Sequence, residues 1–108
     1  MLTGWKLEVD GSSHEVQMSD PTWIALGKEV GGFFEIVRLK NIYSGSDMVV
    51  CVNDCGAIDN LPINQMASMI CAQPIFGPAV LLREGFVDGE PDLISLDDED
   101  LMLCDLFY

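Results

Sequence analysis

The sequence predicts an α+β domain in which a mixed, mainly antiparallel sheet of about five strands is packed by two helices. One helix follows an N-terminal hairpin, and the other is an acidic C-terminal helix. Three features support this prediction: an alternating N-terminal segment, a helix-to-strand junction at Gly31-Gly32, and a strongly acidic last third. With 108 residues, the chain has the length of a single domain, residues 1–108, whose core buries about two thirds of the unfolded surface.

The N-terminal segment has the pattern of two half-buried strands. Leu7 and Val9, and then Val16 and Met18, are separated by polar residues. This alternation is typical of strands that place one face in a core. Residues 10–13, Asp-Gly-Ser-Ser, join the two as a turn. We therefore expect a β-hairpin.

A helix is predicted after the hairpin. Ser19 or Asp20 can cap it through a side-chain oxygen, and Pro21 suits the first turn, where a missing N–H costs nothing. The residues that follow place apolar side chains on one helical face. Gly31 and Gly32 predict the end of the helix, because glycine adopts the left-handed C-cap conformation without a Cβ penalty.

Two apolar strands are predicted next. Residues 33–39 and 48–52 are rich in aromatic and β-branched side chains, and a loop over 41–47 separates them. Their nearly continuous apolar character indicates paired central strands that the helix covers on at least one face. Trp5 and Trp23 are predicted to join the same core.

The middle of the chain contains turn signals and two short elements. Residues 53–56 predict a turn, and residues 60–64 an ordered loop that a proline stiffens. Residues 66–71 fit either a short helix or an irregular crossing segment. Residues 79–82 predict one more strand, the last of the chain.

The C-terminal segment is acidic and predicts a helix over residues 96–107. Half of the 18 acidic residues fall from Glu84 onward. Ser95 followed three residues later by Asp98 resembles a capping box, and acids suit the first turn because the helix dipole favours negative charge there. Leucines of this helix and Phe107 would dock on the sheet and leave the acids in solvent.

The net charge of the chain indicates which classes of partner it can bind. With 18 acidic and 5 basic residues, the net charge is −13, so nucleic acid and anionic lipid would be repelled. A basic protein surface would be attracted instead. The alternative is that the acidity only keeps a small protein soluble.

The chain has no long apolar run and no apolar leader, which predicts a soluble cytoplasmic protein.

The sequence offers few reactive groups. Its four cysteines have neither the spacing of a disulfide framework nor that of a zinc site, and we expect reduced thiols. The one histidine, His14, falls in the predicted hairpin with no nucleophile nearby. Acids between positions 88 and 99 match a calcium-loop register, but Leu93 stands where that loop requires glycine. We therefore predict no enzyme activity, no metal and no cofactor.

Four short motifs follow one another in an order that resembles a known family. They are Val30-Gly31-Gly32-Phe33, Asn53 with Gly56, Leu61-Pro62-Ile63-Asn64 and Gly77-Pro78-Ala79-Val80. In this order they resemble a small uncharacterised family of bacteria, phages and plasmids, domain of unknown function 3846, over roughly residues 6–106. The resemblance implies no particular activity. It implies a cytoplasmic accessory protein of a mobile element, of the kind found among genes that counter host restriction and immunity.

This sequence departs from the family pattern at two places. Asp54 and Cys55 replace the usual glutamate and small or polar residue of the turn after Asn53. Gln65 stands where a basic residue often follows the Leu-Pro-x-Asn loop. The missing basic residue argues against an anion site at that loop.

These observations favour a non-enzymatic inhibitor or accessory protein of a mobile element. It would bind the basic surface of a host defence or nucleic-acid-handling protein, and in the sharpest form its carboxylates mimic DNA phosphates. The predicted partner-binding residues are Asp88, Glu90, Asp92, Asp97, Asp98, Glu99 and Asp100. Two alternatives stay open. One is a module that sequesters a nucleotide near Asn53, Asn60 and Asn64, across a possible homodimer, and the other is a structural dimerisation factor.

Overall fold

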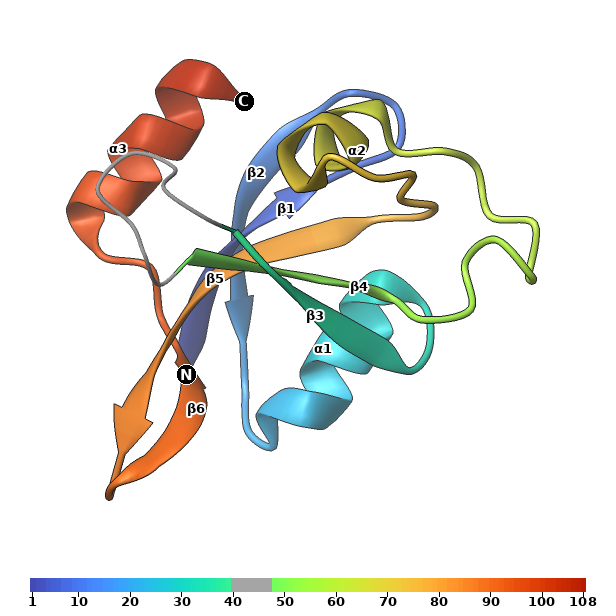
Figure 1. Cartoon of the computed structure of the whole chain (residues 1–108). Coiled ribbons are helices and arrows are strands. Elements are labelled where there is room, and N and C mark those ends of the chain that lie inside the picture. The colour runs from blue at the N-terminus through green and yellow to red at the C-terminus, as the bar shows by residue number, and fades with distance from the viewer. Residues whose placement is uncertain (40–47) are drawn as a thin grey trace.

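A computed structural model describes residues 1–39 and 48–108, and the loop predicted over 41–47 lies outside them. The described residues form one six-stranded antiparallel sheet and three helices (Figure 1). Their bounds are β1 Leu2–Leu7, β2 Ser13–Met18, α1 Thr22–Val30, β3 Phe34–Arg38, β4 Met48–Asn53, α2 Gln65–Cys71, β5 Ala79–Val87, β6 Glu90–Ile94 and α3 Asp98–Phe107. The α+β class and the C-terminal helix are therefore confirmed.

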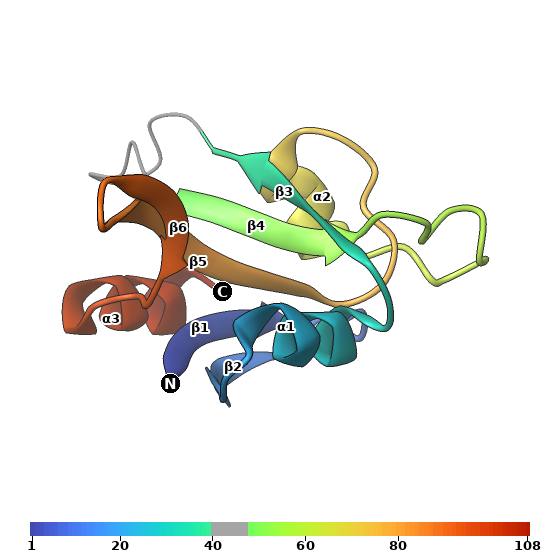
Figure 2. The ribbon, with the colours of Figure 1, turned by 90° about the horizontal axis from the view of Figure 1, so that it is seen from below.

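The helices lie on both faces of the sheet, whose strand order is β2-β1-β5-β4-β3, with β6 paired to β5. Figure 1 shows α2 and α3 on the upper side of the sheet and α1 on the lower side, and Figure 2 shows α1 in front of the sheet from below. Each face has its own apolar cluster. Ala67 of α2 and Cys104 of α3 belong to one, and Leu26 and Val30 of α1 belong to the other.

The central strand β4 is buried along its whole length. Val50 and Val52 pack toward α2 and α3, while Val49 and Cys51 pack toward α1. Because successive side chains of a strand point to opposite faces, a strand covered on both faces needs an unbroken apolar sequence. The predicted pairing with the preceding strand is confirmed, but β3 is an edge strand and not a central one, since β4 is its only partner among the described strands.

The prediction that residues 79–82 form the last strand is wrong. Strand β5 continues to Val87 and turns back as β6, so that the described residues contain one strand more than expected. The turn residues Asp88 and Gly89 both have positive φ, 52° and 81°. This combination suits the two-residue hairpin turn for which Asp-Gly is a strong sequence signal.

The N-terminal hairpin is confirmed, with Leu7 opposite Ser13 at its closed end and Val9 in the turn. The helix α1 begins later than predicted, because Pro21 occupies the N-cap position in place of Ser19 or Asp20. Its end is as predicted. Gly31 has φ 85° and donates its backbone N–H to the carbonyl oxygen of Gly27.

N-cap hydrogen bonds mark where the two remaining helices, α2 and α3, begin. Residues 65–71 are helical because the Asn64 side chain accepts the Ala67 N–H. For α3, the capping box joins Asp97 to Asp100 and not Ser95 to Asp98. None of the helices formed by residues 1–39 and 48–108 is long and apolar enough to span a membrane.

Candidate functional site: an acidic edge and an aromatic groove

Six of the seven predicted partner-binding acids are exposed on two neighbouring elements. The hairpin of β5 and β6 projects from the body of the domain, and α3 begins just after it (Figure 1). We call the exposed carboxylates of this region the acidic edge. Its members are Asp88, Glu90, Asp92, Asp97, Asp98 and Glu99. The two acidic segments follow one another in the chain and lie along the same side of the domain, with the hairpin tip and α3 extending in opposite directions (Figure 1).

The seventh acid, Asp100, is buried and does not belong to this surface. Arg83 of β5 holds it by two hydrogen bonds, from Nε to Oδ2 at 2.5 Å and from Nη2 to Oδ1 at 2.7 Å. Its carboxylate also accepts the Asp97 N–H at 3.0 Å. The carboxylate is therefore occupied within the fold, so we remove Asp100 from the candidate contact residues.

This pair should make part of the stability depend on pH. The hydrogen bond from Arg83 lowers the pKa of Asp100, and burial opposes that shift only in part. A carboxyl group with a lowered folded-state pKa adds stability that is present above its unfolded pKa of about 3.9 and is lost as the pH falls through the folded-state value. Urea unfolding should thus show wild type more stable than Asp100→Asn at pH 7. The difference should shrink progressively below about pH 4, and a constant difference would contradict this account.

Several cations of the described chain are already engaged by carboxylates outside the acidic edge. Arg38 of β3 donates two hydrogen bonds to Glu84 of β5, each 2.8 Å long. Lys6 Nζ lies 3.0 Å from Glu29 Oε1, and Arg83 is bound to Asp100 as described. Each of these cations is thus paired with a carboxylate that is not a member of the acidic edge.

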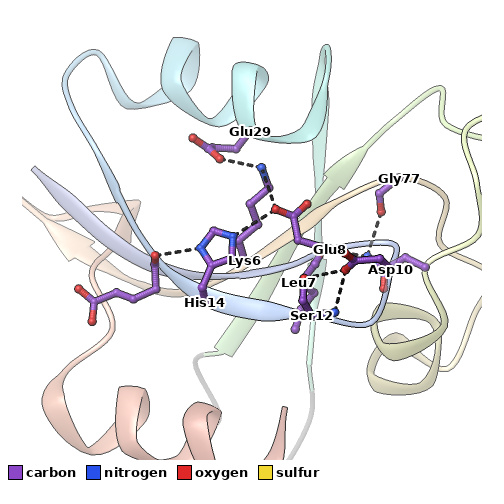
Figure 3. Close-up of polar contacts among 10 residues, drawn as sticks. Lys6, Leu7, Glu8, Asp10, Ser12, His14, Glu29 and Gly77 are labelled. Carbon is purple, nitrogen blue, oxygen red and sulfur yellow. Dashed lines mark hydrogen bonds and ion pairs between the residues drawn. The ribbon is translucent and has the colours of Figure 1, made fainter.

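The cluster around Lys6 ties the hairpin to α1 (Figure 3). The Lys6 ammonium points toward Glu29 of α1 and lies 3.7 Å from Glu8, whose carboxylate is 3.1 Å from His14 Nε2. The hydrogen bond with Glu8 raises the pKa of His14. These charges compensate one another at the closed end of the hairpin, which indicates a structural role.

The three asparagines of the predicted ligand site do not act together. Asn64 is fully buried, and its side-chain amide donates to the carbonyl oxygens of Leu7 and Gly77 at 2.9 and 3.0 Å. Asn53 is buried and donates to the Val30 carbonyl oxygen at 3.1 Å. Asn60 is exposed in a turn with φ 57°. The side-chain amides of Asn53 and Asn64 therefore bind backbone carbonyl groups, which is typical of asparagines in turns and helix caps.

The hollow beside Asn53 has a volume of about 130 Å³ and includes Glu35 and Asp54 in its lining. Ligand pockets usually measure roughly 300–1,000 Å³. The hollow is small for a nucleotide, and its carboxylates would repel the phosphates. Nothing in its geometry favours the nucleotide-binding alternative.

The four sequence motifs prove to be parts of two internal contacts. The Asn53 amide binds the carbonyl oxygen of Val30, and it would lie 3.2 Å from a Cβ added to Gly32. The Gly77 N–H donates to the Pro62 carbonyl oxygen at 2.8 Å, and Asn64 binds the Gly77 carbonyl oxygen. The motifs therefore fix how separate segments pack against one another.

An aromatic groove that no sequence pattern predicted lies between α1, β3 and β6. One hollow of about 500 Å³ and another of about 270 Å³ share Trp23 and Phe34 in their linings. We define the groove by the large apolar side chains of both linings: Trp23, Ile24, Leu26, Phe33, Phe34, Ile36, Pro91 and Leu93.

Trp23 was predicted to be buried, but it is 67% exposed and Phe33 is 86% exposed. Trp23 is the second residue of α1 and lines both hollows, whereas Leu26 and Val30 of the same helix are fully buried against the sheet. The sequence signal was Phe33 directly after the Gly-Gly helix stop, outside the strand that begins at Phe34.

The cysteines are poorly suited to nucleophilic chemistry. Burial raises the pKa of Cys51 and Cys104 to about 12 and that of Cys71 to about 11. A hydrogen bond with Asp54 raises the pKa of the exposed Cys55. Since the thiolate is the reactive form, all four are held as thiols near neutral pH. Residues 1–39 and 48–108 contain no group of three or more His, Cys, Asp or Glu side chains placed to hold a metal ion.

Fold and surface together define a small α+β domain that exposes an acidic edge beside an aromatic groove. The chain belongs to the family described as a domain of unknown function, DUF3846, whose model matches residues 3–106. This match confirms the family resemblance seen in the motifs.

A solved structure shares the fold. A chain described as the small RNA methyltransferase HEN1 superposes with a TM-score of 0.68 at 15% sequence identity, and the match covers 96% of this chain and 16% of that chain. At this identity the likeness concerns the fold alone. No curated protein matches the sequence.

Proposed function

We propose that this chain is a non-enzymatic binding protein whose acidic edge engages the basic surface of a partner protein. The observation that carries the proposal is the exposure of six carboxylates on a projecting hairpin and on the adjoining start of α3. The net charge of −13 would steer a cationic partner toward the domain. The raised pKa values of the four thiols support binding over covalent chemistry.

The finer proposal concerns the partner. We propose a host defence or nucleic-acid-handling protein in the cytoplasm, bound by this chain as the accessory protein of a mobile element. Glu90 and Asp92 are two residues apart on β6, so their side chains leave the same face of the strand. Together with the acids of α3, they would stand where the partner otherwise meets DNA phosphates.

The test is purification of the tagged chain with its partner from host lysate, followed by mass spectrometry and kinetic measurement at low and high salt. The test variant neutralises five acids of the edge: Asp88→Asn, Glu90→Gln, Asp92→Asn, Asp98→Asn and Glu99→Gln. Asp97 is retained because it caps α3. We expect the association rate at low salt to fall about tenfold and its salt dependence to weaken.

A matched control neutralises five exposed acids elsewhere. They are Glu15, Asp20, Glu35, Asp59 and Asp105. Because both variants have the same net charge, a purely global effect of charge would slow them equally. Equal slowing, or a wild-type complex that persists unchanged in about 1 M salt, would contradict the proposal.

A further inference from the structure

The aromatic groove is an unusual surface for a small acidic domain. Phe33 and Trp23 are largely exposed and line the same hollow. Aromatic side chains contribute strongly to interfaces because they bury large areas at little entropic cost. Exposed apolar patches of this kind mark interaction sites.

The groove extends toward the hairpin that carries the acidic edge. Pro91 of β6 lines the second hollow and lies opposite Phe86 of β5, which is 77% exposed. Apolar surface thus runs from the start of β3 to the hairpin tip. At its side lies β3, which has a single neighbour among the described strands. Two hollows in succession beside an edge strand suit an extended segment whose alternate side chains enter them.

Charge decides which kind of segment fits. Asp92 lines the second hollow beside Glu84, whose charge Arg38 compensates, and Asp88 and Glu90 flank the hairpin tip beside Phe86. Lys28 lines the first hollow at the opposite end. A second copy would bring its own charge of −13 to this surface and would be repelled. A segment that carries lysine or arginine would be attracted.

We propose that the aromatic groove docks an extended, cationic segment of a partner protein. Its apolar side chains fill the hollows at Trp23 and Phe34, and its basic side chains face Asp92 and the hairpin. The inference rests on the proposed function only in assigning a cationic partner. It adds a second, apolar contact that would hold the partner after electrostatic attraction has brought it close.

The test uses synthetic peptides of about ten residues as probes. One alternates leucine with lysine, a second leucine with glutamate, and a third serine with lysine. Trp23 is exposed whereas Trp5 is buried, so a blue shift of tryptophan emission reports occupation of the groove. We expect the leucine–lysine peptide to bind and shift the emission. The serine–lysine peptide should bind at least about tenfold more weakly, and the leucine–glutamate peptide should leave the emission unchanged.

Two variants separate groove binding from general adhesion. Phe33→Ser removes an aromatic side chain that is too exposed to support the core, so the melting temperature should stay the same. The affinity for the leucine–lysine peptide should fall about tenfold. Ile58→Ser is the matched control, because Ile58 is 81% exposed in a turn outside the groove. Equal weakening by both variants would overturn the proposal, as would binding of the leucine–glutamate peptide with equal affinity.

Sedimentation of the chain alone tests the competing occupant. A dimer that Phe33→Ser dissociates would show a second copy in the groove and overturn the proposal, whereas a monomer supports it. The two proposals also fail separately. If the edge variant binds the purified partner as wild type does while Phe33→Ser loses affinity even in high salt, only the acidic edge is refuted. If the edge variant loses affinity while Phe33→Ser binds the partner as wild type does, only the proposal for the groove is refuted.

Discussion

Replacing Asn64 with alanine is expected to destabilise the domain by about 3–5 kcal/mol. The side chain is fully buried and binds three backbone groups: the carbonyl oxygens of Leu7 and Gly77 and the N–H of Ala67. Each buried group left without its partner costs about 1–3 kcal/mol. The variant also loses the N-cap of α2. Since small domains are stable by only about 5–15 kcal/mol, this loss is a large fraction of the total stability, and the melting temperature should fall markedly.

Urea unfolding followed by circular dichroism measures this effect, and two variants support the interpretation. Gln65→Ala changes the exposed neighbour and should alter stability by less than about 0.5 kcal/mol. Asn64→Asp keeps the oxygen that caps α2 but replaces the amide donor by a second oxygen facing two carbonyl groups, so it should remain strongly destabilised. A loss of less than about 1 kcal/mol in Asn64→Ala would show that water replaces the amide.

Replacing Asp100 with alanine is expected to cost about 3 kcal/mol or more. The change removes the buried carboxylate that holds Arg83, and it also removes half of the capping box at the start of α3. Breaking one side of a largely buried ion pair is costly because Arg83, whose side chain is mostly buried, loses two hydrogen bonds to a carboxylate. Arg83 belongs to β5, so the loss should weaken the attachment of α3 to the sheet.

The control is Asp98→Ala, in the same helical turn. Asp98 is exposed, and its loss should cost less than about 1 kcal/mol through the helix dipole alone. Hydrogen exchange should show faster opening of α3 in Asp100→Ala than in Asp98→Ala. The double variant Arg83→Met with Asp100→Ala should recover part of the loss, because it also removes the mostly buried charge of Arg83. Equal stability of the two single variants would contradict a structural role for the pair.

The elements predicted from local signals were mostly right, and the errors share a cause. Glycine at the end of α1 and the apolar run of β4 act through their own backbone or side chains, so the sequence shows them directly. The burial of Asp100 depends on Arg83, 17 residues away, and no pattern within α3 reveals it. An aspartate in a helical first turn looks the same in sequence whether its carboxylate meets water or an arginine.

In the candidate site, too, some features follow from local sequence and others depend on contacts between distant segments. The acids at positions 88–99 could be found by counting charges, because a projecting hairpin and a helix start leave them in solvent. The aromatic groove could not, since it requires Trp23 of α1 and Leu93 of β6 to lie beside Phe34 of β3. Conversely, Asn53 and Asn64 looked available for a ligand until the fold supplied their backbone partners.

The sequence by itself determined the α+β class, the family, the negative charge and most of the helices and strands. These follow from properties that each segment carries alone: hydrophobic period, cap and turn chemistry, and ionisable groups. Only the tertiary structure decided which acids are exposed, which amides are occupied and where aromatic side chains meet. Those outcomes depend on contacts between segments far apart in the chain, and the energy of a buried charge, amide or ring is set by the neighbours that folding brings to it.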